Sequence, residues 1–370
     1  SDLKGLINEK DIDVSVKRLL KARFELGEMD DNQKVSWSRI PYSVVCSAKH
    51  DSLSLDMARK SMTLLLNQNN ILPLKRGGQM IAVMGPNAND SVMQWGNYNG
   101  TPKHTITILD GIRSALGKDD KLIYEQGCSW VERKLIKSVF SQCQSAEGAG
   151  FTARYWNNKD YEGEPVATAQ LTTPFRLCTS GATVFAPGVN LTDFSAIYQS
   201  VFTPAESGNV VFEFYSCGGT QLLVNGEEVK KFTNKHGSRG TSYGMYVEAN
   251  KPYKIEIKFQ YFSGDAQLNF DLGFKRDADI KSSVAKVKDA DVVIFVGGIS
   301  PSLEGEEMGV DLEGFKRGDR TDIELPAVQR ELIKALYNAG KKVVFVNCSG
   351  SPIGMEPETK YCQAKIGRAH

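Results

Sequence analysis

The hydrophobic pattern divides the chain into stretches with different periodicity. In 55–145, and again in 277–364, short apolar runs of strand length alternate with segments whose apolar residues recur every three or four positions. This alternation is typical of a parallel-rich sheet with flanking helices. Between them, over 146–276, short segments of alternating polarity replace the helical period. We therefore predict an α/β protein, a split α/β sandwich interrupted by an all-β sandwich insertion.

The two α/β stretches show the same alternation of predicted helices and strands. In the first, an amphipathic helix begins at Leu55 and passes into extended chain, and the predicted strand at 80–84 stops at a Gly-Pro-Asn-Ala turn. A helix at 109–116 and a strand at 122–124 follow. In the second stretch we predict helices at 280–288 and 326–336, and strands at 292–296 and 342–347. Glycine and proline punctuate these elements, as expected for βα turns.

The insertion is predicted from its strands and turns. Segments with strand-like alternation lie at 151–156, 196–202, 209–215, 221–224 and 253–261. Asn225-Gly226 is a two-residue hairpin signal, because both residues tolerate positive φ. The alternation and the turns close within the span, so we expect a β-sandwich with its own core.

The N-terminal residues predict a helix followed by a linker. Ile12, Val16, Leu19, Leu20 and Phe24 recur at helical spacing, and Gly27 suits a helix C-terminus. We therefore expect a helical segment over 1–30 and a polar linker over 31–54.

Composition and charge exclude several classes of function. The 370 residues carry 45 Lys and Arg against 44 Asp and Glu, a formal net charge of +1. This balance gives no reason to expect a nucleic-acid partner, and no apolar run is long enough for a membrane-spanning helix. The seven cysteines lack CxxC or Cys-His spacing. We expect reduced, mostly buried thiols, no metal site and no cofactor.

Candidate chemistry gathers on one loop. The strand at 292–296 runs through Gly297-Gly298 into a segment with Glu304, Glu306, Glu307, Asp311 and Glu313. A run of charges is often only a solvated loop. However, ligands of open α/β sheets bind at the carboxyl ends of strands, and long loops in compact domains are often functional. Gly305 lies between two acids and would allow close presentation of a carboxylate, which favours a functional site.

The same loop carries a family resemblance. The run 297–307, followed by Gly-Asp-Arg at 318–320 and Leu-Pro at 325–326, resembles the acid/base loop of glycoside hydrolase family three. The segment 55–74 and the Gly-Pro-Asn-Ala turn at 85–88 are similar to the start of that family's α/β sandwich. Family members are retaining, exo-acting β-glycosidases, mainly β-glucosidases and β-xylosidases. An N-terminal barrel carries their Asp nucleophile, and the sandwich carries a Glu acid/base.

The resemblance implies roles for individual residues. Glu306, preceded by Gly305, matches the family's Gly-Glu position and is the expected general acid/base; Glu304 and Glu307 are the alternates. Glu304 would also act as a like-charge neighbour that raises the pKa of the acid. Asp319 and Arg320 are expected to pin the loop by ion pairing. Retaining enzymes hold the two carboxyl groups about 5–5.5 Å apart, and no cofactor is needed.

The resemblance also implies how the chain is organised. The helix in 1–30 would be the end of a barrel domain that lies upstream with the nucleophile. The sandwich would be cut short at 364, with 365–370 a non-native tail. We expect a fragment of an enzyme that removes terminal xylose, or else glucose, from oligosaccharides in the periplasm or outside the cell. The alternative of another class is a non-catalytic carbohydrate-binding or structural fragment.

The insertion resembles a protective-antigen-like module found in some family members. The motifs that carry this likeness are at 154–156, 203–208, 223–226 and 251–253. Calcium-dependent sugar-binding versions of the module carry an Asp-Asp pair before the glycine of the central turn, whereas this chain has Ser-Cys-Gly-Gly at 216–219. We expect a structural or active-site-rim role, without calcium. The polar loop at 96–100 could reach a sugar or form a plain turn.

Overall fold

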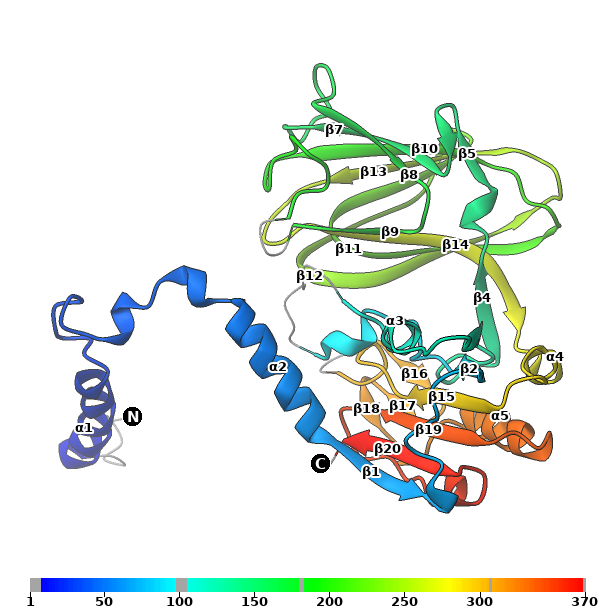
Figure 1. Cartoon of the computed structure of the whole chain (residues 1–370). Coiled ribbons are helices and arrows are strands. Elements are labelled where there is room, and N and C mark those ends of the chain that lie inside the picture. Colours follow the sequence, from blue (N-terminus) through cyan, green and yellow to red (C-terminus); the bar gives the residue numbers. More distant parts are fainter. Residues whose placement is uncertain (1–7, 98–104, 180–182, 306–307, 369–370) are drawn as a thin grey trace. The chain divides into compact units, whose positions relative to one another are not determined.

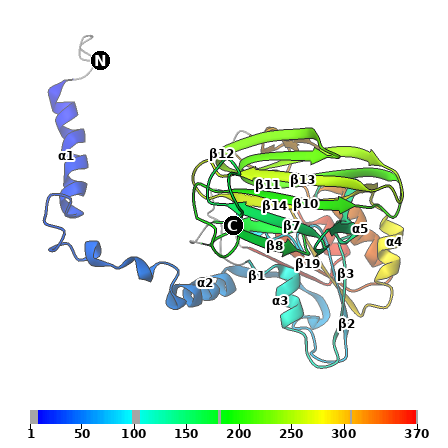
Figure 2. The ribbon, with the colours of Figure 1, turned by 90° about the horizontal axis from the view of Figure 1, so that it is seen from above.

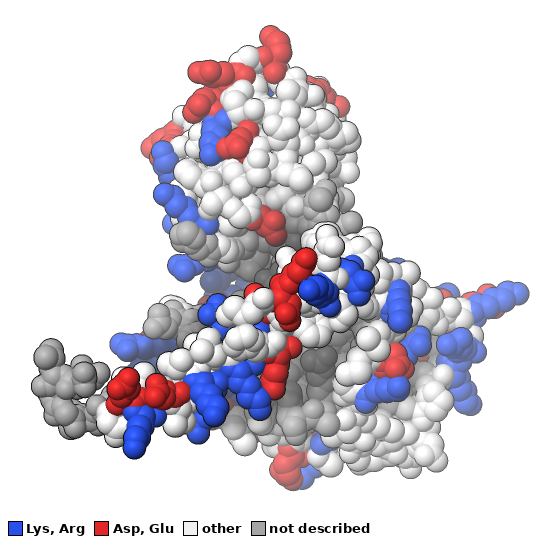
Figure 3. Space-filling model, turned by 90° about the vertical axis from the view of Figure 1, so that its left-hand side faces the viewer, with Lys and Arg blue, Asp and Glu red and all other residues white. Residues whose placement is uncertain are grey.

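The structure is a computed structural model that describes residues 8–97, 105–179, 183–305 and 308–368. The chain forms two compact units, Ser1–Met62 and Thr63–His370. Figure 1 labels their helices and strands. On the face drawn in Figure 3, basic and acidic side chains are interspersed and wide areas carry neither, as the balanced composition predicts.

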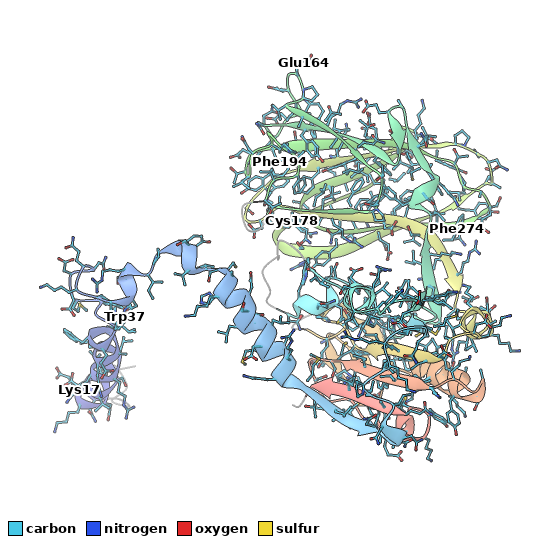
Figure 4. The ribbon with its side chains drawn as sticks, viewed as in Figure 1. Lys17, Trp37, Glu164, Cys178, Phe194 and Phe274 are labelled. Atoms are coloured by element: carbon cyan, nitrogen blue, oxygen red, sulfur yellow. The ribbon has the colours of Figure 1, made fainter. Side chains whose placement is uncertain are left out.

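The first unit is helical. Helix α1 (Glu9–Glu25) begins at a capping box, in which the side chains of Asn8 and Asp11 each accept a hydrogen bond from the other's backbone N–H. It ends before Gly27, which has a φ of 73°. The indole of Trp37, labelled in Figure 4, donates to the carbonyl of Leu26 at 3.1 Å. The predicted helix is therefore confirmed, but its apolar stripe is exposed in this unit.

The predicted linker at 31–54 is partly helical. It contains the 3-10 turns η2 (Trp37–Arg39) and η3 (Tyr42–Val44) and the start of α2 (Ala48–Ser61). Helix α2 thus begins before Leu55, since no glycine or proline interrupts the sequence from 48 to 61. It lies in the first unit rather than in the α/β part.

A six-stranded sheet forms the centre of the α/β part. Its order is β1 (Met62–Asn67), β20 (Ala364–Arg368), β19 (Val343–Cys348), β15 (Val292–Gly298), β2 (Met80–Met84) and β3 (Lys121–Glu125). The pairs from β20 through β3 are parallel. Strands β2 and β15 are buried almost throughout, which explains their continuous apolar sequences.

Helices cover both faces of this sheet. One apolar cluster joins Phe295 and Phe345 to α4 (Ile280–Lys286) and α5 (Ala327–Asn338). The other joins Val83 and Ile294 to α3 (Ile108–Ser114). The predicted parallel-rich sheet with flanking helices is therefore confirmed, and it is assembled from segments on both sides of the insertion.

Residues 365–368 occupy a strand position. They belong to β20, whose Lys365 and Ile366 pair in parallel with Phe345 and Val346 of β19. The ammonium group of Lys365 donates to Thr359 at 2.6 Å. The predicted tail at 365–370 therefore begins inside the sheet, as far as the structure describes it. The non-native origin of these residues stays a prediction.

The insertion is longer than predicted. Strand β4 (Lys134–Ser138) pairs antiparallel with β14 (Gln267–Asp277), and Phe140 belongs to the sandwich core. The insertion therefore runs from about 134 to 277, and the predicted boundary at 146 is corrected. The sequence Lys-Leu-Ile-Lys-Ser of β4 has too little alternation to indicate a strand by itself.

One long strand joins the two layers of the insertion. Strand β12 (Glu227–Val247) pairs with β11 (Gly208–Val224) along nearly its whole length. On the other edge of β11, β14 pairs with the first part and β13 (Tyr253–Gln260) with the last part. The change of partner follows an irregularity between Ser216 and Gly218, where Gly218 has a φ of 142°. Figure 2 shows the strands side by side. The remaining strands are β5 (Cys143–Ser145), β6 (Gly148–Ala149), β7 (Phe151–Trp156), β8 (Ala167–Leu171), β9 (Phe175–Cys178) and β10 (Ser195–Phe202).

The predicted strands and hairpin of the insertion are present. The five predicted segments fall in β7, β10, β11 and β13, and Asn225 and Gly226 have φ values of 55° and 88°. The layers enclose a core rich in aromatic rings, for example Phe175 against Phe270 with centroids 5.2 Å apart. Phe194 and Phe274, labelled in Figure 4, belong to this core.

Candidate functional site

The acidic loop after β15 has a core of its own. Ile299, Leu303 and Phe315 are buried in a small cluster with Trp130 packed against them. Above this cluster the loop forms three two-residue strands, β16 (Asp311–Leu312), β17 (Phe315–Lys316) and β18 (Asp319–Arg320). A merely solvated loop would have no reason to bury three large apolar side chains, so the described part of this loop is packed rather than merely solvated.

A buried glutamine clamps the base of the loop. The side-chain oxygen of Gln329 accepts from the Gly298 N–H at 2.8 Å. Its nitrogen donates to the carbonyls of Gly298 at 2.7 Å and Trp130 at 2.9 Å. Gly298 has a φ of 117°, and a Cβ there would lie 2.1 Å from the carbonyl oxygen of Cys348. The strand can therefore turn into the loop at this point only with glycine.

The Gly-Pro-Asn-Ala turn after β2 holds the same base from the other side. The fully buried Asn87 donates its amide to the carbonyls of Gly297 and Ile299, both at 3.2 Å. The indole of Trp130 donates to the Asn87 side-chain oxygen. A Cβ on Gly85 would lie 2.2 Å from the carbonyl of Val296. The two motifs singled out in the sequence are thus one structural unit.

Two glycines fix the chain immediately before Glu306. The N–H of Gly305 donates to the carbonyl of Gly318 at 3.1 Å. A Cβ on Gly318, whose φ is 87°, would lie 1.9 Å from the Gly305 oxygen. A Cβ on Gly305 would lie 2.8 Å from the sulfur of Met308. Close approach of the two backbones therefore requires glycine at 318, whereas a Cβ at 305 would meet only flexible side chains.

Glu304 is half-buried and engaged in two hydrogen bonds that reach other segments. Its carboxylate accepts from the hydroxyl of Ser351 at 2.8 Å, and its carbonyl accepts from the amide of Asn97 at 2.8 Å. Asn97 belongs to the loop predicted either to reach a sugar or to form a plain turn, and its described part contacts the acidic loop. Ser351, which sequence reasoning missed, follows the end of the neighbouring strand β19.

Glu306 and Glu307 lie outside the described residues, so the acid/base assignment stays a prediction. The residues on either side are described, and Gly305 is anchored as given above. Among the predicted site residues, the structure therefore places Glu304, Asp319 and Arg320.

Arg320 contacts the loop mainly through an aromatic ring and a backbone carbonyl. Its side chain is only 10% exposed, its guanidinium lies 5.1 Å from the centre of the Phe315 ring, and it donates to the Glu324 carbonyl at 2.9 Å. Its ion pair, with Asp322, is long at 4.0 Å. Asp319 is exposed and forms no ion pair with the residues that the structure describes. The expected pinning of the loop by ion pairs of Asp319 and Arg320 therefore stays a prediction, supported for Arg320 by the long contact with Asp322. The two side chains point to opposite faces, because they are neighbours on a strand.

A further carboxyl near this edge of the sheet is structural. Burial raises the pKa of Asp90, although hydrogen bonds from the N–H groups of Met93 and Val92 act in the opposite direction. Those bonds, 3.0 and 2.8 Å long, form a local turn just before η5 (Met93–Trp95). The Asp90 carboxylate is thus occupied by hydrogen bonds from backbone N–H groups.

Metal and membrane features are not found in the described parts of the chain. No group of three or more His, Cys, Asp or Glu side chains there could hold a metal ion. No helix there is long and apolar enough to cross a membrane. Of the cysteines, Cys128, Cys143, Cys217 and Cys362 are buried and Cys46 is exposed. Burial raises the pKa of the Cys143 and Cys362 thiols to about 12.

Known proteins resemble this chain over most of its length. A xylan 1,4-beta-xylosidase from Xylanibacter ruminicola is 46% identical over 98% of the chain and 42% of that protein. A beta-glucosidase from Rhizobium radiobacter is 28% identical over 79% of the chain and 35% of that protein. The chain thus spans less than half the length of these two relatives.

A solved structure and a family profile agree with this likeness. The crystal structure of a beta-glucosidase from Kluyveromyces marxianus has a TM-score of 0.57 and 20% identity, covering 99% of this chain and 44% of that one, and it supports the fold alone. The profile described as glycosyl hydrolase family 3 C-terminal domain matches residues 62–367. Since that match covers well over half of the sequence, the chain belongs to glycoside hydrolase family 3.

Proposed function

We propose that this chain supplies the general acid/base of a retaining, exo-acting β-glycosidase that removes terminal β-linked xylose from oligosaccharides. The anchored acidic loop at the carboxyl end of β15 is the observation that carries the proposal. The substrate is inferred from the relative named as a xylan 1,4-beta-xylosidase. Because such substrates derive from plant polymers, we also propose a periplasmic or secreted location, which cell fractionation tests.

The loop geometry favours Glu306 as the acid/base. A catalytic carboxyl must be held to within about 0.5 Å of its productive position. Gly305, the preceding residue, is fixed by its hydrogen bond to Gly318. The Glu304 carboxylate already accepts a hydrogen bond from Ser351, and the Glu304 carbonyl accepts one from Asn97. We therefore assign Glu304 to holding the loop.

The reaction is a double displacement. In the first step, Glu306 protonates the oxygen of the departing sugar while a second carboxylate attacks the anomeric carbon. In the second step, the ionised Glu306 takes a proton from water, whose oxygen bonds to the anomeric carbon and displaces the second carboxylate, which releases the sugar. We propose that the second carboxylate comes from an N-terminal barrel domain, as the family resemblance implies. The exposed apolar stripe of α1 would pack against that barrel.

Two other functions remain to be separated by experiment. A β-glucosidase is favoured by the name of the Rhizobium radiobacter protein. Matched aryl β-xyloside and β-glucoside substrates distinguish it through kcat/KM. A non-catalytic carbohydrate-binding or structural role predicts no turnover by the longer protein that carries this chain. Residues 1–370 alone should not hydrolyse aryl β-xylosides, whether the protein prefers xylose or glucose, because we propose that the second carboxylate comes from the N-terminal barrel domain.

The leaving group tests the assignment of Glu306. In the longer protein, Glu306→Ala should reduce hydrolysis of xylobiose by about 10²–10⁴-fold, because a sugar hydroxyl is a poor leaving group. Cleavage of a dinitrophenyl β-xyloside needs no proton, so its first step should be spared, and azide should restore turnover. Glu304→Ala and Glu307→Ala are the matched controls and should show neither effect.

The same assay can reject the assignment. If Glu304→Ala or Glu307→Ala shows the leaving-group dependence and azide rescue while Glu306→Ala does not, the acid/base is that neighbouring residue. If all three variants cleave xylobiose normally, the loop does not supply the acid/base.

A further inference from the structure

A groove lies across the outer face of the insertion. Its volume is about 340 Å³, at the lower end of the ~300–1,000 Å³ typical of ligand sites. Its walls come from β7, β10, β11 and β13 and from the turn before β6, and none of its lining residues belongs to the acidic loop. The groove is therefore separate from the residues assigned to catalysis.

A straight row of side chains crosses this groove. Gln199 of β10 lies directly opposite Thr152 of β7 and Glu256 of β13, and Glu256 lies opposite Leu223 of β11. Residues paired in this way share one face of a sheet, at the strand spacing of about 4.8 Å. Thr152 is buried and Leu223 is apolar, so the row presents two polar groups, Gln199 and Glu256, at a spacing comparable to the size of a sugar ring.

The polar side chains are already oriented by one another. Arg154 donates to the Gln199 side-chain oxygen at 2.8 Å, and the Gln199 nitrogen donates to Glu256 at 2.7 Å. Each keeps unused capacity, since an amide nitrogen has two hydrogens and a guanidinium has five. The groups are planar and fixed before a ligand arrives, which lowers the entropy cost of binding.

The charges along the row are compensated. Arg154 pairs with Glu147 at 3.0 Å, and Glu256 contacts Lys258 at 3.5 Å. Lys254 adds an exposed cation to the groove lining. A phosphate or a nucleic acid would need a cluster of cations, which this row lacks. The charge pattern instead suits a neutral ligand that accepts and donates hydrogen bonds.

Apolar side chains lie between the polar ones. Val201 and Leu223 are half-buried members of the groove lining. A sugar ring has the matching character, because its hydroxyl groups point outward while its C–H groups form apolar faces. The floor thus offers contact to the ring faces while the row bonds the hydroxyl groups.

We propose that this groove is a calcium-independent binding site for a neutral, linear oligosaccharide, with Gln199 and Glu256 of the row and the neighbouring Arg154 as its hydrogen-bonding side chains. The site belongs to the insertion and does not depend on the acid/base assignment. It would hold a stretch of glycan that does not react.

The test is binding of xylohexaose, a neutral unbranched oligosaccharide, to the whole chain by isothermal titration calorimetry. Gln199→Ala removes the side chain that is hydrogen-bonded to both Arg154 and Glu256. It should weaken binding of xylohexaose by roughly tenfold or more. Gln221→Ala is the matched control, because Gln221 lies on β11 outside the groove lining and should bind as the unchanged chain does. Equal melting temperatures show that both variants are folded.

A second measurement locates the ligand. Hydrogen exchange should show protection in β7, β10 and β13, with or without calcium. A chain with Glu304, Glu306 and Glu307 all changed to Ala should bind equally well, which separates this site from the proposed acid/base. The proposal is overturned if the whole chain does not bind xylohexaose, if Gln199→Ala binds normally, if only a uronic-acid-bearing glycan binds, or if protection falls on the acidic loop.

Discussion

Substitution of Gly318 tests whether the acidic loop is held as the structure indicates. In Gly318→Ala, the added Cβ would lie 1.9 Å from the Gly305 oxygen, so the two backbones must separate. The φ of 87° is unfavourable for alanine by about 1–2 kcal/mol, and loss of the Gly305–Gly318 hydrogen bond costs about 0.5–1.5 kcal/mol. We therefore expect the loop to lose about 1.5–3.5 kcal/mol of local stability.

Two assays measure this loss. In the whole chain, hydrogen exchange of the amides in 303–320 should accelerate more than exchange in the central strand β15, because the perturbation is local. In a protein that joins this chain to the proposed barrel domain, displacement of the proposed acid/base by about 1 Å should lower kcat for xylobiose by about 10²-fold. A dinitrophenyl xyloside should be affected less in its first step.

Two other glycines of the same loop provide matched controls. Gly309→Ala meets no atom within 4 Å and should change neither exchange nor kcat. Gly314 has a φ of 81°, but its nearest contact is 3.5 Å, so Gly314→Ala isolates backbone strain from the clash. If Gly318→Ala matches Gly309→Ala in both assays, the close approach of Gly305 and Gly318 does not fix the loop.

Three further predictions concern stability. Gln329→Leu leaves three buried backbone groups unpaired and should cost about 3–5 kcal/mol in urea unfolding, whereas Lys334→Leu on the exposed side of α5 should stay within about 0.5 kcal/mol. Hydrogen bonds from the N–H groups of Gln79, Gly77 and Gly117 lower the pKa of Asp120. The stability that Asp120 contributes is present above its unfolded-state pKa and is lost as pH falls through the lower folded-state pKa. Asp120→Asn should therefore lower the melting temperature at pH 7 and weaken the fall of the melting temperature at acidic pH. An unchanged fall at acidic pH would contradict this. Calcium should not raise the melting temperature, because the bend at 216–219 carries no carboxylate; a rise that chelation reverses would show a calcium site.

Elements with strong local signals were predictable from the sequence. Strand β2 has its predicted bounds, and β15 extends the predicted strand by two glycines, because apolar β-branched runs are bounded there by charged residues and glycine. Strand β12 was missed, since Glu227–Val247 is mostly polar and contains three glycines. It is a strand because β11 offers it a long antiparallel partner, and this tertiary effect overrides local propensity.

The position of the candidate site in the sequence was predictable, but the contacts that hold its loop were not. The acids and glycines of the loop are adjacent in sequence, so their pattern indicated the loop. Gln329, which holds the base of the loop, is 31 residues from Gly298, but the other groups come from far along the chain. Asn87 bonds to Gly297 across 210 residues, and the Trp130 carbonyl bonds to Gln329 across 199. Such hydrogen bonds have no local pattern, because the partners meet only when the split sheet closes around β15.

The insertion is tied to this site through its first connecting segment. Trp130, just before β4, packs under the acidic loop and bonds to both Asn87 and Gln329. Three residues later, Arg133 bonds Glu331 on α5 and holds the pKa of that carboxyl below its usual value. The Arg133 carbonyl also accepts from the N–H of Ala278, where the chain leaves the insertion. The segments that enter and leave the insertion are thus joined to each other and to the base of the loop. A change that loosens this junction would disturb the loop without touching an acidic residue, so the junction gives a physical basis for the structural role expected of the insertion.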